Sequence, residues 1–127
     1  MRPIFALALV LGACATESSS DGAAGTRADA VDPLAGMTAG RAQQCLQSRQ
    51  IRHTEVLTGR EAIVFEAHDG TRYLSAPRGG CAGLRGDVTV VNERDPLCAG
   101  DNVRLVGPGR LDAGSCVVAE FIPYRRR

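Results

Sequence analysis

The sequence has no lysine and no tryptophan, and phenylalanine and tyrosine together make up only 4% of its 127 residues. Its formal net charge is +1, which argues against a dedicated nucleic-acid-binding domain, because such domains carry a marked basic excess or stripe. It contains no CxxC pair, so neither a zinc ribbon nor a thioredoxin-type redox motif is expected. The apolar fraction of 44% is ordinary, and the length suits one small domain with appendages.

The longest uncharged apolar run lies at the N-terminus, at residues 3–13, directly behind Arg2. It has the length of the hydrophobic region of a signal peptide and is too short for a transmembrane helix, which needs roughly 20 apolar residues. The run ends in Leu-Gly-Ala-Cys14, which resembles the lipobox of bacterial lipoproteins. We therefore expect residues 1–13 to be a signal peptide and Cys14 to carry acyl chains that anchor the protein in a membrane. The alternative is an ordinary cleaved secretory signal in which Cys14 is incidental.

Residues 14–37 are rich in Ser, Gly, Ala and Asp and have few large apolar side chains, which is typical of a flexible linker. Ala15 rather than Asp follows the lipobox cysteine, and this favours the outer membrane over the inner one. We expect an exported protein, held in the cell envelope and facing the periplasm. Its folded domain is predicted at residues 38–124 and a basic tail at residues 125–127.

Four cysteines remain beyond Cys14, and an even number in a small exported domain indicates a disulfide framework. Of the three possible connectivities, we favour Cys81–Cys98, which closes a short loop, with Cys45–Cys116, which ties the start of the domain to its last strand. Chain entropy then predicts that each disulfide stabilises the fold by about 3–4.5 kcal/mol. A nucleophilic thiol is not expected, because the count is even and no cysteine has a histidine near it in the sequence.

One short helix and about six strands are expected in the folded domain. Residues 38–50 contain good helix formers behind a possible Thr cap. After them, β-type runs alternate with turn residues, at 51–58, 61–67, 71–75, 87–92, 102–106 and 115–122. Asp69-Gly70 predicts a hairpin with a type I′ turn between the second and third runs. The chain has no room for crossover helices, so the predicted fold class is mainly β, a small antiparallel barrel or sandwich with two disulfides.

Several pieces of the folded part occur in an order that resembles a known family. They are Cys45-Leu46 with Ile51-Arg52, the run around Ile63 and Phe65, Tyr73-Leu74 leading into Cys81-Ala82-Gly83-Leu84, Leu97-Cys98-Ala99-Gly100-Asp101 with Val103, and Cys116 with Phe121. Over about residues 45–122 the order is similar to that of an uncharacterised family of small exported proteobacterial proteins, a domain of unknown function. The chain departs from it at Ala82, where members often have Pro, and at Ser75, where they often have Gly or Asn. The resemblance implies export, four framework cysteines and a β-rich fold, and it implies no activity.

Candidate catalytic groups are few and scattered. His53 lies in an expected strand, His68 lies in a turn beside Asp69, and no serine lies in a G-x-S-x-G elbow. The two histidines and Asp69 lack the close spacing of metal ligands. Carboxylate pairs for glycoside cleavage can be drawn, as in any β protein, from Glu55, Glu61, Glu66, Asp87 and Asp101. Of these, Asp101 is expected to accept hydrogen bonds from local backbone N–H groups at a tight turn. From these patterns we predict no catalytic residue, no metal and no cofactor.

Arginines are the candidate binding residues. The tail residues Arg125, Arg126 and Arg127 could contact lipid headgroups or another anionic envelope polymer, because the guanidinium group suits bidentate contacts to phosphate. A frayed, solvated tail is the alternative. Arg78 and Arg85 lie in an expected loop and are the other candidates.

These features together predict a non-enzymatic binding or structural module, lipid-anchored in the cell envelope. Its expected partners are the membrane, reached through the lipid anchor, and another envelope protein or an anionic envelope polymer, but not nucleic acid. The first alternative is a periplasmic inhibitor or ligand-binding lipoprotein that acts through the loop at 77–86. The second alternative is an enzyme with an unrecognised site.

Overall fold

The structure is a computed structural model and describes residues 32–127. The expected signal peptide, the lipidated Cys14 and most of the expected linker lie outside the described residues. Residues 32–37, which the sequence assigned to the linker, belong to the compact unit that runs from Asp32 to Arg127. Within this short segment Leu34 is buried, and the Asp32 carboxylate lies 2.9 Å from the guanidinium group of Arg60.

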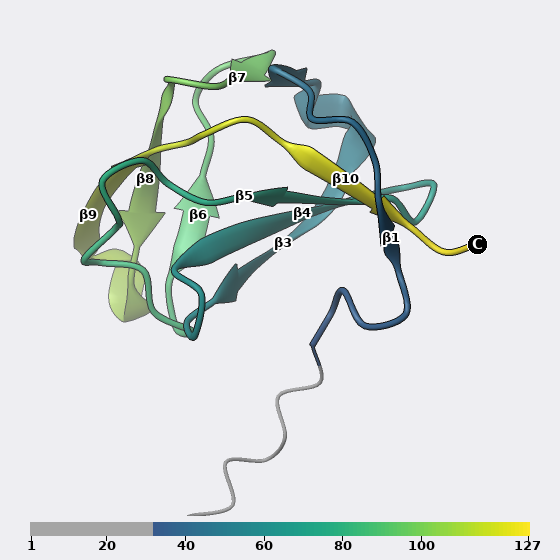
Figure 1. The fold of residues 1–127 in the computed structure, drawn as a ribbon. Coiled ribbons are helices and arrows are strands. Elements are labelled where there is room, and N and C mark those ends of the chain that lie inside the picture. Colours follow the sequence, from purple (N-terminus) through teal and green to yellow (C-terminus); the bar gives the residue numbers. More distant parts are fainter. Residues whose placement is uncertain (1–31) are drawn as a thin grey trace, which may run out of the picture. The chain divides into compact units, whose positions relative to one another are not determined.

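Strands form most of the regular structure of residues 32–127. The elements are β1 (Thr38–Ala39), β2 (Cys45–Leu46), the 3-10 turn η1 (Ser48–Gln50), β3 (Ile51–Leu57), β4 (Ala62–Ala67), β5 (Arg72–Ser75), β6 (Thr89–Val91), β7 (Leu97–Cys98), β8 (Asn102–Val106), the 3-10 turn η2 (Pro108–Arg110), β9 (Asp112–Val117) and β10 (Ile122–Arg125). A five-stranded sheet has the order β1-β10-β5-β4-β3, a three-stranded sheet has the order β6-β8-β9, and β2 pairs with β7 (Figure 1). Every pairing among these strands is antiparallel.

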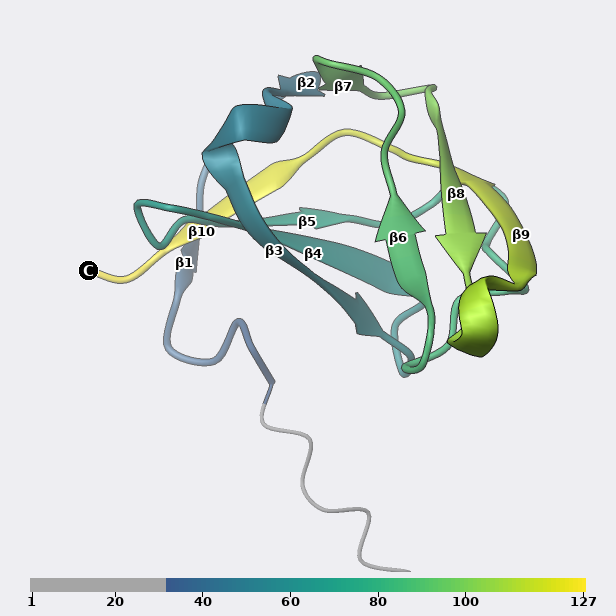
Figure 2. The ribbon, with the colours of Figure 1, turned by 180° about the vertical axis from the view of Figure 1, so that it is seen from behind.

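The core lies between the five-stranded and three-stranded sheets, which Figure 2 shows from behind. Val103 and Leu105 of β8 are fully buried, and the rings of Phe65 and Phe121 meet edge to face with centroids 5.6 Å apart. The predicted fold class, mainly β and antiparallel with two disulfides, is confirmed. The prediction left a barrel and a sandwich open, and no closed barrel is found, because each sheet of the described chain ends in edge strands.

Strand β4 is buried on both of its faces, and this positions the candidate site. Ile63 and Phe65 point into the core, while Val64 and Glu66 alternate to the opposite face and are buried as well. On that opposite face, Arg72 of β5 donates a hydrogen bond to the carbonyl oxygen of Pro33. The first described residues therefore lie beside the outer face of the sheet, next to a buried carboxylate.

The predicted helix at 38–50 is wrong, because the segment forms β1, β2 and the single turn η1. Its backbone groups pair with distant strands: Gly40 N–H donates to Pro123 O at 2.7 Å, and Gln43 N–H donates to Phe121 O at 2.8 Å. A helix over these residues would give up those bonds and would bury no more than a narrow apolar stripe. Helix propensity is a weak preference, and here long-range pairing overrides it.

Two other local predictions need correction. The last expected strand, 115–122, is divided into β9, which pairs with β8, and β10, which pairs with β5, so the chain crosses from one sheet to the other. The β4–β5 hairpin is present, but its turn is not type I′. A type I′ turn needs two residues with positive φ, but in this loop only Gly70 has one, of 85°. The N–H of Ala67 donates to Thr71 O, which encloses a loop of three residues.

The favoured disulfide connectivity is also wrong, because the bonds join Cys45 to Cys98 and Cys81 to Cys116. Cys45 lies directly opposite Cys98 in the β2–β7 pair, with Cα atoms 4.0 Å apart. Cys81 lies in the loop that packs on β9, and its Cα is 5.5 Å from that of Cys116. Strand pairing decides which cysteines meet, and it cannot be derived from loop lengths alone.

Candidate functional site

Four arginines line one surface hollow of about 420 Å³ beside the β4–β5 hairpin. They come from β3, from β5, from the end of β10 and from the residue after it, and two carboxylates lie among them. Four guanidinium groups and two carboxylates give the hollow a formal charge of +2. We call this site the arginine cleft, and it consists of Arg52, Arg72, Arg125, Arg126, Glu66 and Asp69.

Glu66 holds two of the four guanidinium groups in place. Its side chain is only 11% exposed. Arg52 donates through Nη2 to Oε1, and Arg72 donates through Nε to Oε2 at 3.1 Å, with its Nη2 also 3.1 Å from that oxygen. A buried carboxylate is costly unless it is paired and hydrogen-bonded, so these two arginines stabilise Glu66 while it fixes their positions.

The register of the sheet brings this trio together. Arg72 lies directly opposite Glu66 across the β4–β5 pair. On the other side the β3–β4 register shifts between Ile51 and His53, so that Arg52 is the extra residue of a β-bulge beside Glu66. A bulge changes the direction of a side chain at a sheet edge, and here it explains how an edge-strand arginine reaches the carboxylate.

Arg125 and Arg126 complete the cleft from the opposite side, because β10 pairs with β5 and places Tyr124 across from Arg72. Arg125 donates through Nε to the hydroxyl oxygen of Thr71 at 3.2 Å. Neither Arg125 nor Arg126 forms an ion pair within residues 32–127, and both are exposed. The cleft therefore contains two guanidinium groups whose positions Glu66 fixes and two that remain available to an added anion.

Asp69 lies at the tip of the hairpin and is already engaged locally. Its Oδ1 accepts the N–H of Thr71 at 2.9 Å. Hydrogen bonds from the backbone and side chain of Thr71 lower the pKa of Asp69, and the positive charge of Arg125 adds to this effect. Asp69 is therefore ionised at neutral pH, and it keeps the hairpin in shape rather than offering a proton.

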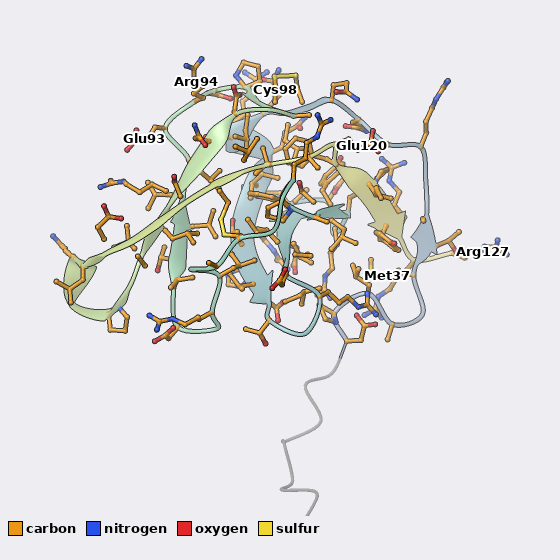
Figure 3. All side chains as sticks on the ribbon, turned by 60° about the vertical axis from the view of Figure 1, so that its left-hand side comes forward. Met37, Glu93, Arg94, Cys98, Glu120 and Arg127 are labelled. Carbon is orange, nitrogen blue, oxygen red and sulfur yellow. A yellow bond between two sulfur atoms is a disulfide. The ribbon has the colours of Figure 1, made fainter. Side chains whose placement is uncertain are left out.

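The other predicted binding residues are not in the cleft. Arg127 is exposed beyond β10, and Figure 3 shows it on the same side of the domain as Met37, with Glu93 on the opposite side. Met37 itself lines the cleft. Arg78 and Arg85 lie in the loop at 77–86, where Arg85 pairs with Asp87 at 3.5 Å.

That loop is held firmly against β9. Cys81 is buried and bonded to Cys116, and the N–H of Arg78 donates to Val117 O at 3.1 Å. Gly83 approaches the backbone oxygen of Ala113 so closely that a side chain there would clash. The loop is thus a fixed protrusion that presents exposed Arg78 and Arg85.

The two histidines and Asp101 do not line the arginine cleft. His53 and His68 are exposed, and within residues 32–127 neither imidazole forms a hydrogen bond. Asp101 accepts the N–H of Cys98 at 2.9 Å, which confirms its predicted turn role. No group of three or more potential metal ligands occurs in the part of the chain that the structure describes.

Sequence reasoning missed Arg52 and Arg72 as site residues and gave Glu66 no specific role. One available signal was Glu66 itself, the single charged residue of the otherwise apolar segment 62–67. A hairpin centred on Asp69 also places residues 66 and 72 opposite each other, which pairs an acid with an arginine. The bulge that redirects Arg52 has no comparable sequence signal.

Comparison with known proteins adds no assignment. No protein-family model, curated protein or solved structure matches the chain. Within residues 32–127, no helix has the length and apolar character needed to cross a membrane. A function for this chain therefore has to be inferred from the arginine cleft and from the N-terminal sequence.

Proposed function

We propose that the protein is a lipid-anchored binding module of the cell envelope that holds an anionic group in the arginine cleft. The observation that carries this proposal is the convergence of four arginines, from three strands and the C-terminal tail, on one hollow with a formal charge of +2. Guanidinium groups present planar donor forks that match carboxylate and phosphate oxygens. The fixed positions of Arg52 and Arg72 make the cleft more than a diffuse basic patch.

The cell-envelope assignment is supported by two features. The Leu-Gly-Ala-Cys14 motif resembles a lipobox, and the two disulfides fit an oxidising compartment outside the cytoplasm. The intact mass of the protein extracted from membranes tests this assignment. We expect acyl chains on a chain that begins at Cys14 and no reactive thiol before reduction. An unmodified chain, or free thiols, would contradict it.

Binding, rather than catalysis, is the role that the cleft supports. Both carboxylates are occupied: Glu66 pairs with two guanidinium groups and Asp69 accepts the N–H of Thr71. General acid or base catalysis requires a positioned group that can exchange a proton near neutral pH. Arginine does not do so in proteins, so the available groups of the cleft can bind and orient an anion.

Anion binding can be tested with two double variants of equal charge. Arg125→Gln/Arg126→Gln removes the available side of the cleft, and Arg78→Gln/Arg110→Gln removes two exposed arginines elsewhere. Titration calorimetry with citrate and with inorganic phosphate should show about tenfold weaker binding in the first variant, equivalent to about 1.4 kcal/mol. The control should bind nearly as the unmodified chain does. Equal weakening in both variants, or no binding by the unmodified chain, would overturn the proposal.

A second candidate function is inhibition of an envelope enzyme by the loop at 77–86. The observation that favours it is the fixed attachment of this loop to β9 through Cys81–Cys116, since rigid loops bind with little loss of conformational freedom. Inhibition of a cell-wall hydrolase such as lysozyme is the direct assay. Alanine substitution of Arg78 and Arg85 should weaken inhibition, and unchanged affinity would exclude this loop as the contact.

A further inference from the structure

We infer that the anion taken by the arginine cleft is the phosphate group of lipid headgroups in the membrane that anchors the chain, so that the domain docks on the bilayer by its β4–β5 hairpin end. This inference rests on the proposed function, because it needs both the lipid anchor and anion binding in the cleft. It adds the chemical class of the ligand and the orientation of the domain.

The start of the described chain lies at the rim of the cleft. The carbonyl oxygen of Pro33 accepts a hydrogen bond from Arg72, and Met37 lines the hollow. From Cys14 to Asp32 there are 18 residue steps (32 minus 14), which span at most about 65 Å in any conformation. An anchor at Cys14 therefore keeps the cleft within reach of the membrane surface, where phosphate esters are concentrated.

The arrangement of donors suits a phosphate group. Arg52 and Arg125 enter the hollow from β3 and β10, which are separated by β4 and β5. Three inter-strand spacings put their backbones about 14 Å apart, so the guanidinium groups approach a central anion from different sides. The phosphodiester of a lipid headgroup carries two charged, unesterified oxygens on a tetrahedral phosphorus, and both accept strong hydrogen bonds from guanidinium groups. Such a group can therefore be contacted by donors from different sides of the hollow.

The charge distribution of the domain favours the same orientation. The arginine cleft, with its formal charge of +2, is the basic region of the hairpin end, and a second hollow beside it, lined by Arg49 and Asp69, is formally neutral. On the three-stranded sheet, by contrast, a hollow lined by Glu93, Arg104 and Asp112 has a formal charge of −1. An anionic membrane surface attracts the arginine cleft and repels the hollow on the three-stranded sheet.

A tethered domain needs only a weak headgroup site. When one attachment is already made, the second contact forms at an effective concentration that reaches the millimolar range for short linkers. A basic residue near an anionic leaflet contributes on the order of a fivefold change in binding. Two available arginines and one half-exposed arginine, Arg52, are therefore enough to bias the docked orientation.

Arginine-specific labelling of the lipidated full-length mature protein tests this inference. The protein is held in neutral detergent micelles and treated with phenylglyoxal, and the modification rate of each arginine is followed by peptide mass spectrometry. Parallel samples contain phosphatidylglycerol, phosphatidylcholine, inorganic phosphate or acetate. With phosphatidylglycerol we expect about fivefold slower modification of Arg52, Arg125 and Arg126, with Arg78 and Arg110 unchanged as internal controls.

The outcomes separate the inference from the proposed function. Protection by phosphatidylglycerol that disappears at Arg52 in the Arg125→Gln/Arg126→Gln variant supports headgroup binding in the cleft. Protection by inorganic phosphate or acetate, but not by the lipid, overturns the inference and leaves anion binding in place. No protection by any of these anions overturns both. Equal protection of Arg78 and Arg110 indicates only a general surface potential and overturns a specific site.

Discussion

The substitution Glu66→Gln examines the centre of the arginine cleft directly. Glutamine keeps nearly the same shape but removes the negative charge on which two guanidinium groups depend. The side chain of Arg72 is 25% exposed and makes two contacts of 3.1 Å with Oε2, and hydrogen bonds to charged groups contribute about 1.5–3 kcal/mol. Arg52 is 54% exposed, so its pair is screened and adds less than about 1 kcal/mol. We expect Glu66→Gln to lower the free energy of unfolding by about 2–3 kcal/mol.

Urea unfolding with both disulfides intact is the appropriate assay, and Glu55→Gln is a matched control. Glu55 is an exposed glutamate on neighbouring β3 and forms no ion pair within residues 32–127, so its substitution should change stability by less than about 0.5 kcal/mol. The affinity for inorganic phosphate should rise in Glu66→Gln, because a carboxylate that competes for the guanidinium groups is gone. A stability change as small as that of the control would show that Glu66 does not organise the cleft.

Three further predictions concern the scaffold. The pKa of Asp69 is lowered in the folded state, so the ionised carboxylate stabilises the fold above the ordinary pKa of 3.8, and this stabilisation is lost as the pH falls through the folded-state pKa. The variant Asp69→Asn lacks the Thr71 contacts of a charged carboxylate. In an acid titration followed by circular dichroism, it should therefore lose less stability than the unmodified chain. Cys81→Ala/Cys116→Ala opens a loop with a sequence separation of 35 and should cost about 4 kcal/mol in urea unfolding, while a loss below about 1 kcal/mol would contradict this pairing. Ser75→Ala removes a fully buried hydroxyl that donates to the carbonyl oxygen of Ala119 and accepts its N–H, both at 3.0 Å, in the segment leading to β10. We expect the free energy of unfolding to fall by about 2–3 kcal/mol, and an unchanged value would contradict these bonds.

The parts of the fold that the sequence predicted well are those set by local pattern. Residues 62–65 are a continuous apolar stretch, and apolar and polar residues alternate at the start of 102–106. Asp69-Gly70 separates two of the expected strands, so β4, β5 and β8 appear close to where they were expected. The segment 38–50 was misread because its conformation depends on backbone partners about 80 residues away, such as Pro123 for Gly40. Local propensity carries no information about such partners.

The candidate site shows the same division between local and long-range information. Arg125 and Arg126 could be identified because a basic tail is visible in the sequence itself. Arg52 and Arg72 could not, because their convergence on Glu66 requires the β3–β4–β5 register and a bulge of one residue. A shift of one residue in that register would turn each side chain to the other face of the sheet, so the site exists only as a property of the correct pairing.

The cleft also separates stability from binding in a way that substitutions can use. Glu66 neutralises part of the charge of Arg52 and Arg72 and is itself buried, so this half of the cleft contributes mainly to the fold. Arg125 and Arg126 are exposed and form no ion pair within the described chain, so their loss should weaken anion binding with little effect on unfolding. If Arg125→Gln/Arg126→Gln instead destabilises the domain as much as Glu66→Gln does, the tail is a structural clamp on the hairpin, and the anion site must lie elsewhere.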